Sequence, residues 1–300
     1  MDKKLVNCFS INFNLSAEWI ITIVGLLGNS VVLFILSRKK FRHISMFRYY
    51  FVSVVFDSIR ILTLMPHNLA DLFRINVYSI VFKLANYTSN VIALFVSFIN
   101  IIASVDRYVN TVHHHKYKIH RRIKFQVVIL SAALVLSFGI EFPLLFFEDK
   151  VLITNYTSMC ESVNPLISFA IDMSQSVFLT MIPFMTNLVL NCLTGCQLIK
   201  KKICLKRGTF KKEKKLFKML VSIEIFLFLC YFAWFAYVIT NDVFNLVNIA
   251  SDSMPIIHDI AEFIYYMYPA GYFFVFLASS KKFRKYFKSI FNTKRKKKNA

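Results

Sequence analysis

Residues 20–37 read IITIVGLLGNSVVLFILS, eighteen consecutive positions without a charged side chain. At 1.5 Å per residue, a helix of this length spans about 27 Å, close to the roughly 30 Å hydrocarbon core of a membrane. A backbone that crosses lipid must satisfy its own hydrogen-bonding groups, and a continuous apolar run without alternation favours a helix over a barrel strand. The stretch is therefore predicted to be a transmembrane helix.

Six further stretches share this apolar character. They cover residues 46–69, 83–105, 125–147, 166–199, 216–240 and 255–277. The composition agrees, because 57% of the 300 residues are hydrophobic and only 18% are charged, which is more apolar surface than a soluble domain of this length can bury. It also excludes a disordered or collagen-like chain. The predicted fold is an all-α membrane protein, a seven-transmembrane helix bundle followed by a short amphipathic eighth helix.

The formal net charge of +21 is concentrated in every second segment that connects the predicted helices. Residues 38–48, 107–124, 200–218 and 281–300 hold thirty-one of the thirty-seven Lys and Arg side chains. Because positively charged loops remain in the cytosol, these segments are predicted to be cytosolic and the N-terminus extracellular. The first apolar run is too long for a cleaved signal peptide, so we expect it to remain as the first helix.

This orientation divides the chain into three parts of a multi-pass plasma-membrane protein. Residues 1–19 form an extracellular N-terminus, residues 20–280 the transmembrane domain, and residues 281–300 a cytoplasmic amphipathic helix with a polybasic tail. The amphipathic part is expected to lie along the inner leaflet, and Lys294–Lys298 to contact anionic lipids. A nucleic-acid partner is not expected, because the basic run adjoins a membrane span. Asn14 and Asn155 lie in glycosylation sequons on the extracellular side, whereas the Asn86 sequon falls in the third helix and is expected to be unmodified.

The most specific local motif is Asp106-Arg107-Tyr108, at the cytosolic end of the third predicted helix. With this motif and this charge layout, the chain resembles the rhodopsin-like (class A) family of G-protein-coupled receptors over about residues 24–287. Further positions match the family at Gly28, Asn29, Asp57, Pro66 and Pro183. The resemblance implies a receptor that transduces an extracellular ligand to a cytosolic heterotrimeric G protein.

Two carboxylates are expected near the guanidinium of Arg107, which stands at the boundary between lipid and cytosol. Asp106 is adjacent in sequence, and the resemblance places Glu213 at the start of the sixth helix, facing the third. A tie between Arg107 and these carboxylates would hold the two helices together at rest, and its release would act as a switch. The open alternative is that Glu213 is a solvated acid among the neighbouring lysines.

The chain departs from the family pattern in the sixth and seventh helices. Tyr231 stands at the family's toggle position, and the proline kink is absent. The seventh-helix motif has two registers, one on Tyr268-Pro269 and a preferred one on Tyr272–Phe276. In the second register Phe273 replaces the motif's proline, which is similar to invertebrate peptide receptors.

Asp57 and Arg60 are two charges inside the second predicted helix, beside the intramembrane polar residue Asn29 of the first. Because they lie three residues apart, we expect them to form an ion pair, shared with Glu262, in place of the family's sodium site. The open alternative is that Arg60 faces elsewhere and Asp57 is a hydrated buried acid.

The ligand pocket is expected in the outer half of the bundle. Its candidate residues are Ser89, Asp172, Tyr231, Trp234, Asp259 and Glu262. Because Ser89 stands where amine receptors of the family carry an acid, an amine ligand is disfavoured. The acidic outer loops favour a basic or amidated peptide, with a small chemosensory ligand as the competitor.

Two other classes of protein compete with the receptor interpretation, namely a transporter or channel and an enzyme. A transporter or channel would need a polar file, for which Asp57, Arg60, Glu224 and Glu262 are the only candidates. No nucleophile, metal or phosphate motif supports an enzyme, a cofactor or a metal site.

Of the six cysteines, only Cys8 and Cys160 lie on the predicted oxidising side. The family's usual third-helix cysteine is replaced by Phe82, so a Cys8–Cys160 bridge is the one intrachain disulfide open to the outer pair. Two free or intermolecular thiols are the alternative.

Overall fold

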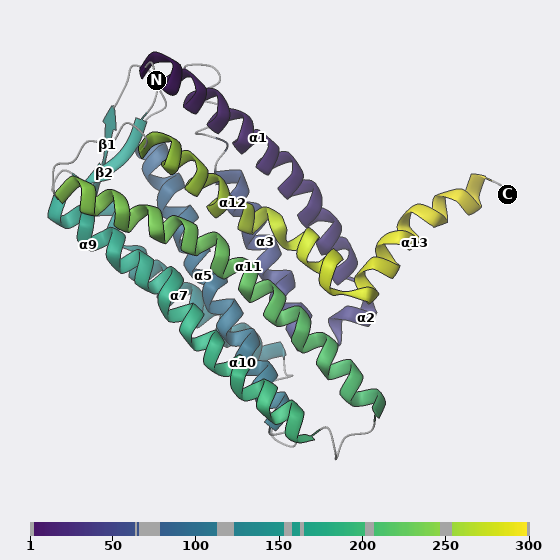
Figure 1. The fold of residues 1–300 in the computed structure, drawn as a ribbon. Helices are drawn as coiled ribbons and strands as arrows, with labels where there is room; N and C mark the ends of the chain where they lie inside the picture. The colour runs from purple at the N-terminus through teal and green to yellow at the C-terminus, as the bar shows by residue number, and fades with distance from the viewer. Residues whose placement is uncertain are drawn as a thin grey trace.

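Long helices run side by side between the two ends of the molecule (Figure 1). The computed structural model describes residues 3–63, 65, 79–112, 123–152, 158–162, 165–201, 207–246 and 254–298. The helices are α1 Lys3–Leu36, α2 Lys39–Arg42, α3 Ser45–Thr63, α5 Ser79–Val112, α7 Ile123–Glu141, α8 Leu144–Phe147, α9 Pro165–Ser176, the π-helix η1 Val177–Met181, α10 Ile182–Lys201, α11 Arg207–Leu246, α12 Met254–Ser279 and α13 Lys281–Lys298. β1 Glu148–Leu152 and β2 Ser158–Ser162 pair antiparallel, with Lys150 opposite Cys160.

Within the described residues, six helical stretches are long and apolar enough to cross a membrane. They are Ser16–Leu36, Lys83–Val112, Ile123–Glu141, Met173–Lys200, Glu213–Asn241 and Ile256–Ser279. The predicted second span corresponds to α3, which carries the three charged residues Arg48, Asp57 and Arg60 within nineteen residues and is not among these six stretches. α3 packs against α1, α5 and α12 inside the bundle, and its role as a seventh span stays a prediction.

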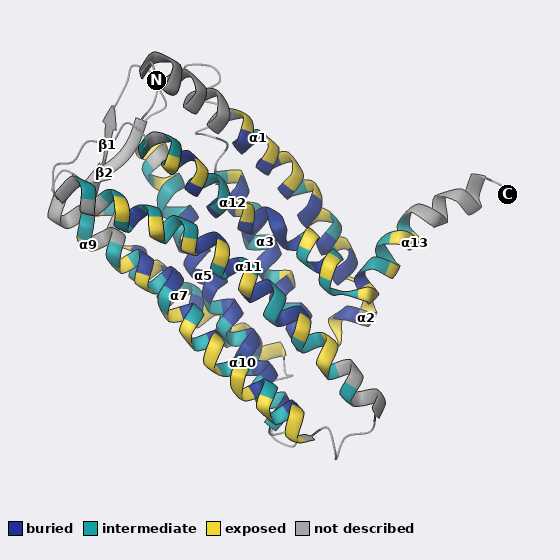
Figure 2. Cartoon of the chain, in the orientation of Figure 1, coloured by how far each residue is buried: buried dark blue, intermediate teal, exposed yellow. Residues whose placement is uncertain are grey.

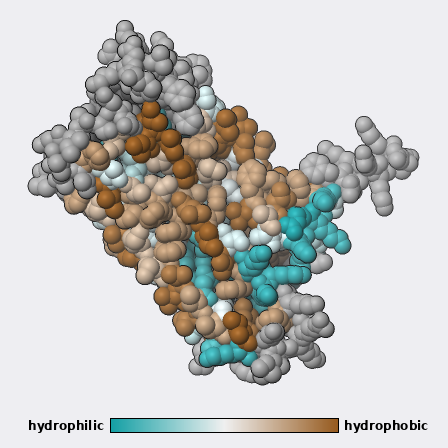
Figure 3. Space-filling model, viewed as in Figure 1, coloured by the Kyte–Doolittle hydropathy of each residue, from teal (hydrophilic) through white to brown (hydrophobic). Residues whose placement is uncertain are grey.

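Large apolar side chains cover the outward faces of the bundle, whereas the inward faces are buried (Figure 2). Leu27, Val128, Val135 and Leu229 are each more than half exposed. Figure 3 shows apolar residues along the flanks and hydrophilic residues gathered at the end where α13 leaves the bundle. An exposed apolar surface of this extent is a liability in water and the expected surface in lipid.

Proline divides the fourth and fifth predicted helices into pieces. The fourth was expected over 125–147, but α7 ends at Glu141 and the short α8 follows Pro143, because the residue before a proline is disfavoured in a helix. In the fifth, Pro183 has no N–H and crowds the carbonyl four residues earlier. The π-turn η1 stands directly before Pro183, where such an insertion can relieve that crowding.

The junction between α12 and α13 is fixed by side chains that cap both helices. The Ser280 hydroxyl accepts the backbone N–H of Phe283 at 3.2 Å, as an N-cap residue does. Arg284 Nη1 donates to the carbonyls of Leu277 and Ala278, both at 2.7 Å, which satisfies the free end of α12. The Phe283 ring stacks on Phe276, so the start of α13 is anchored to the bundle.

Candidate functional site

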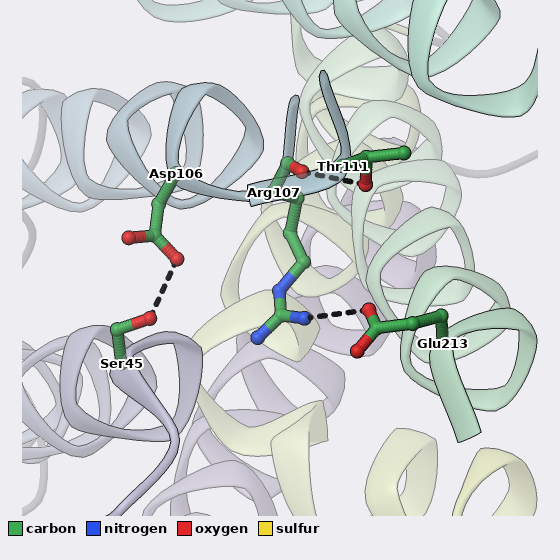
Figure 4. A network of polar contacts seen from close by, with 5 residues as sticks. All are labelled: Ser45, Asp106, Arg107, Thr111 and Glu213. Atoms are coloured by element: carbon green, nitrogen blue, oxygen red, sulfur yellow. Dashed lines mark hydrogen bonds and ion pairs between the residues drawn. The ribbon is translucent and has the colours of Figure 1, made fainter. Parts of the chain in front are cut away.

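An ion pair joins α5 and α11 at the end of the bundle near α2 and α13. Arg107 Nη1 lies 3.4 Å from Glu213 Oε2, with side-chain exposures of 4% and 24% (Figure 4). Thr111 Oγ1 donates to the Arg107 carbonyl at 2.9 Å, one turn further along α5. The expected contact between Arg107 and Glu213 is therefore present, and Glu213 is not merely one of several solvated charges.

Asp106 points away from Arg107 and towards α3. Its Oδ2 accepts a hydrogen bond from Ser45 Oγ at 2.7 Å (Figure 4). The expected pair of carboxylates around Arg107 is thus wrong for Asp106, because consecutive residues of a helix do not face each other. Tyr108 is half-buried on the same turn. The motif consequently connects α5 to two neighbours, α3 through Asp106 and α11 through Arg107.

A second buried polar tie holds α11 three helical turns beyond Glu213. The Glu224 carboxylate accepts hydrogen bonds from Ser104 on α5 and from Asn191 on α10. Glu224 is only 7% exposed. The sequence showed this acid inside a span but gave no indication of its two partners, which come from different helices.

Arg60 is fully buried in the centre of the bundle and does not pair with Asp57. Its Nη1 donates to the Tyr231 hydroxyl at 3.3 Å and its Nε to Ser89 Oγ at 3.4 Å. The guanidinium carbon lies 4.4 Å from the centre of the Tyr265 ring. The expected Asp57–Arg60 pair is therefore wrong: the three-residue spacing puts both on one face, but the long arginine reaches α5, α11 and α12 instead.

Asp57 is also fully buried, and neither carboxylate oxygen has a hydrogen-bond partner among the described residues. The third member of the predicted intramembrane polar set, Asn29, donates instead to the Pro269 carbonyl of α12 at 3.0 Å. Glu262, expected to share in the Asp57–Arg60 pair, lies beside His258. The polar residues of the membrane interior thus form separate clusters and not one network.

An aromatic column that the sequence interpretation missed runs along α12 beside the Arg60 cluster. Tyr231 of α11 lies 5.3 Å from Tyr265 and 5.4 Å from Tyr268, measured between ring centres. Tyr268 and Tyr272 are 5.3 Å apart, and their hydroxyls are hydrogen-bonded. The spacing of three and four residues between these tyrosines was the available signal, since it places them on one face of a helix.

The N-terminal end of α12 gathers the remaining described pocket candidates. His258 Nδ1 lies 3.3 Å from Asp259 Oδ1 and 3.8 Å from Glu262 Oε2. The Trp234 ring of α11 meets the His258 ring edge-on, with centres 5.7 Å apart. Ser89 and Tyr231 lie deeper, at Arg60.

Several other predicted residues cannot be placed. The side chains of Cys8, Asn14, Cys160 and Asp172, and all of Asn155, lie outside the described residues. The disulfide and the glycosylation sites therefore stay predictions.

The comparison with known families is consistent with this geometry. A family model described as 7 transmembrane receptor (rhodopsin family) matches residues 28–270, which include the Arg107–Glu213 contact, the Arg60 cluster and the aromatic column as far as Tyr268. No curated protein sequence gives a match. The chain therefore belongs to the rhodopsin family, class A, of G-protein-coupled receptors and is a multi-pass membrane receptor with a signalling role.

Proposed function

We propose that the receptor transmits the binding of an extracellular peptide to a heterotrimeric G protein in the cytosol. It lies in the plasma membrane with residues 1–19 outside, seven transmembrane helices within residues 20–280, and residues 281–300 in the cytoplasm. The gathering of basic residues in every second connecting segment supports this orientation. The amphipathic start of α13 lies on the inner leaflet, and its basic tail contacts anionic lipids.

The observation that carries the coupling mechanism is the ion pair between Arg107 and Glu213. It closes α11 against α5 at the cytosolic end, and the Glu224 tie holds the same two helices from inside the bundle. An agonist that favours a state with α11 displaced breaks both ties and leaves Arg107 free to contact the G protein. The ligand supplies the difference in free energy between the two states through its differential affinity for them.

The pocket chemistry supports a peptide over an amine. A positively charged guanidinium already contacts Ser89, the position where amine receptors of the family carry an acid, so an ammonium group would be repelled there. Asp259 and Glu262 instead provide negative charge at the outer end of α12, which suits a basic or amidated peptide. A small chemosensory ligand is the second candidate, favoured by the enclosure of Arg60 among aromatic rings.

The polar residues inside the bundle disfavour a transporter or channel. Asp57 and Arg60 are fully buried in packed surroundings. Glu224 is engaged by partners on two helices. A transporter or channel needs a row of polar groups that line a water-filled path across the membrane and exchange partners along it. The described residues instead form separate, enclosed clusters.

The test is nucleotide exchange on purified G proteins, using receptor reconstituted in lipid nanodiscs. Glu213→Gln removes the charge opposite Arg107 and is expected to raise basal exchange about fivefold, corresponding to about 1 kcal/mol for a partly exposed charged contact. Arg107→Ala is expected to reduce exchange to the level of G protein alone. The matched control is Lys214→Gln, which changes an exposed charge beside Glu213 and should behave as the wild type.

Each result bears on a different part of the proposal. Basal exchange that is equal in Glu213→Gln and the wild type would show that the tie does not restrain the receptor. Exchange that survives Arg107→Ala at the wild-type level would count against coupling through the Asp106-Arg107-Tyr108 motif.

A further inference from the structure

Three potential metal ligands converge at the outer end of α12. His258 and Glu262 are four residues apart and so share a face of the helix, and Asp259 adjoins them. One ligand atom from each residue lies within 4.8 Å of the other two. These residues match no established metal-binding motif, so no metal was predicted at this position from the sequence.

The distances suit a small tetrahedral ion. Ligand atoms about 2.0–2.2 Å from a zinc ion lie roughly 3.3–3.6 Å from one another in tetrahedral geometry. In the structure, His258 Nδ1 is 3.3 Å from Asp259 Oδ1 and 3.8 Å from Glu262 Oε2. The ligand oxygens of Asp259 and Glu262 lie within 4.8 Å of each other, so the three atoms must draw closer together to contact one ion.

We propose that His258, Asp259 and Glu262 form a Zn²⁺ site at the extracellular mouth of the bundle. One imidazole nitrogen and two carboxylates are a donor set that zinc uses, whereas Ca²⁺ and Mg²⁺ prefer oxygen ligands alone. Three protein ligands leave a fourth position for water or for a donor atom of the receptor's own ligand. That the mouth is extracellular rests on the proposed orientation of the receptor.

The surroundings hold the donors while leaving them accessible. The His258 ring meets the rings of Trp234 and Tyr237 on α11 edge-on, with centres 5.7 and 5.1 Å apart. The side chains of His258 and Glu262 are 18% and 21% exposed, so an ion can reach them from solvent. The buried carboxylate of Glu18 on α1 adds negative charge that acts on His258.

Zinc at this site bears on how α12 packs against α11 at the end of α12 that carries His258. The ligands belong to α12, but the His258 ring packs on α11, so a bound ion fixes that ring against Trp234 and Tyr237. Trp234 in turn lies 5.5 Å from Tyr265, the ring beneath Arg60. Zinc therefore favours the present arrangement of α11 and α12, and it acts as a modulator of the resting receptor.

The experiment measures zinc binding to the full chain in lipid nanodiscs, without a polyhistidine tag. His113, His114 and His115 are replaced by alanine in every sample, because this run could bind zinc independently. Zn²⁺ is titrated against a chromophoric chelator, and the thermal unfolding temperature is recorded with and without zinc. One ion per receptor is expected, together with a rise in the unfolding temperature.

The principal variant is His258→Phe, which keeps an aromatic ring against Trp234 and Tyr237 but removes the nitrogen ligand. It is expected to lose the stoichiometric zinc, and Glu262→Gln to bind zinc at least about tenfold more weakly. His43→Phe, at an exposed histidine near the opposite end of the bundle, is the matched control and should bind as the background does. Unfolding temperatures without zinc establish that each variant is folded.

The background is the receptor that carries only the alanine replacements at His113, His114 and His115. The proposal would be overturned if His258→Phe bound zinc as tightly as this background, or if the background itself bound no stoichiometric zinc. Binding of Ca²⁺ in preference to Zn²⁺ would overturn it as well. Because no G protein is present, failure of the coupling proposal leaves this result unaffected. The sidedness is tested separately, by comparing zinc access in right-side-out and inside-out vesicles.

Discussion

Arg60 is a buried cation held by aromatic and hydroxyl groups. Among the described residues no carboxylate forms an ion pair with it, and its contacts are the Tyr231 hydroxyl, Ser89 Oγ and the face of Tyr265. Such a site uses properties specific to arginine, namely a planar, delocalised charge and several N–H donors in fixed directions. Lysine, which carries a point charge on a flexible side chain, cannot reproduce these properties.

Arg60→Lys should consequently lower the stability of the receptor although the charge is kept. The substitution loses the contact with the Tyr265 face and at least one of the hydrogen bonds to Ser89 and Tyr231, at a cost of about 2 kcal/mol. In a chain of 300 residues that corresponds to a fall of about 3 °C in the unfolding temperature. Thermal unfolding in nanodiscs, followed by intrinsic fluorescence, measures it.

The chain offers a control with the same chemistry at its surface. Arg38 is exposed and lies over the Phe34 ring, 4.5 Å from its centre. Arg38→Lys should change the unfolding temperature by less than about 2 °C, because exposed cation–π contacts contribute little. Equal effects at the two positions would mean that burial of the Arg60 guanidinium does not set its contribution.

The partner of Arg107 was predicted correctly from the sequence, whereas the partner of Arg60 was not. Arg107 was expected to meet Glu213 because a boundary arginine needs a carboxylate and the resemblance to the receptor family placed this acid at the start of the sixth helix, facing the third. For Arg60 the same logic selected Asp57, the nearest acid in sequence. The arginine side chain is long enough to choose partners on α5, α11 and α12, and those partners depend on tertiary packing.

At the scale of the helices, α1 and α12 approach each other closely at a glycine of α1. A Cβ atom on Gly25 would lie 2.9 Å from the Cβ and 3.3 Å from the Cα of Ala270, and 2.7 Å from Cδ1 of Ile61. Gly28, one turn further along α1, faces Phe273 in the same way. Small residues let helix backbones pack closely in lipid, where association depends on van der Waals contact.

Gly25→Ala should therefore destabilise the bundle, although alanine is the better helix former. Overpacking against the rigid backbone of Ala270 costs about 1–3 kcal/mol, which exceeds the helix-propensity gain of about 1 kcal/mol. Gly139→Ala on α7 isolates that gain, because nothing lies within 4 Å of its added Cβ. The two variants should shift the unfolding temperature in opposite directions, down for Gly25→Ala and up for Gly139→Ala. A rise for Gly25→Ala would show that α1 can move away from α12 at no cost.

Helix boundaries followed the sequence where an element ends for local reasons. Pro143 ends the fourth helix, and Ser280 begins the last one by capping it. The apolar runs predicted only the parts of α1 and α11 that suit lipid, whereas both helices continue for several turns beyond them. The extra turns mix polar with apolar residues and form no continuous apolar run, so the lengths could not be predicted from hydrophobicity.

For the whole molecule, charge asymmetry predicts which end faces the cytosol. The Arg107–Glu213 contact and the start of α13 lie at one end, and the hairpin of β1 and β2 lies with the N-terminus at the other (Figure 1). Three sequons report on this orientation, because glycans are added only on the extracytoplasmic side. Asn155 falls between β1 and β2, Asn14 precedes the first apolar stretch, and Asn86 lies within α5.

When the receptor is expressed in cells that glycosylate secreted proteins, Asn155→Gln should remove one glycan and Asn86→Gln none. The side-chain amide oxygen Oδ1 of Asn86 accepts a hydrogen bond from Asn90 Nδ2 at 3.3 Å, within a helix predicted to be embedded in lipid, so the transferase cannot reach it. Asn14→Gln should also remove a glycan. Gel mobility before and after enzymatic deglycosylation measures each. An unglycosylated wild type whose β1–β2 segment is cleaved by protease only from the cytosolic side would reverse the orientation, and with it the assignment of Arg107 to the G-protein face.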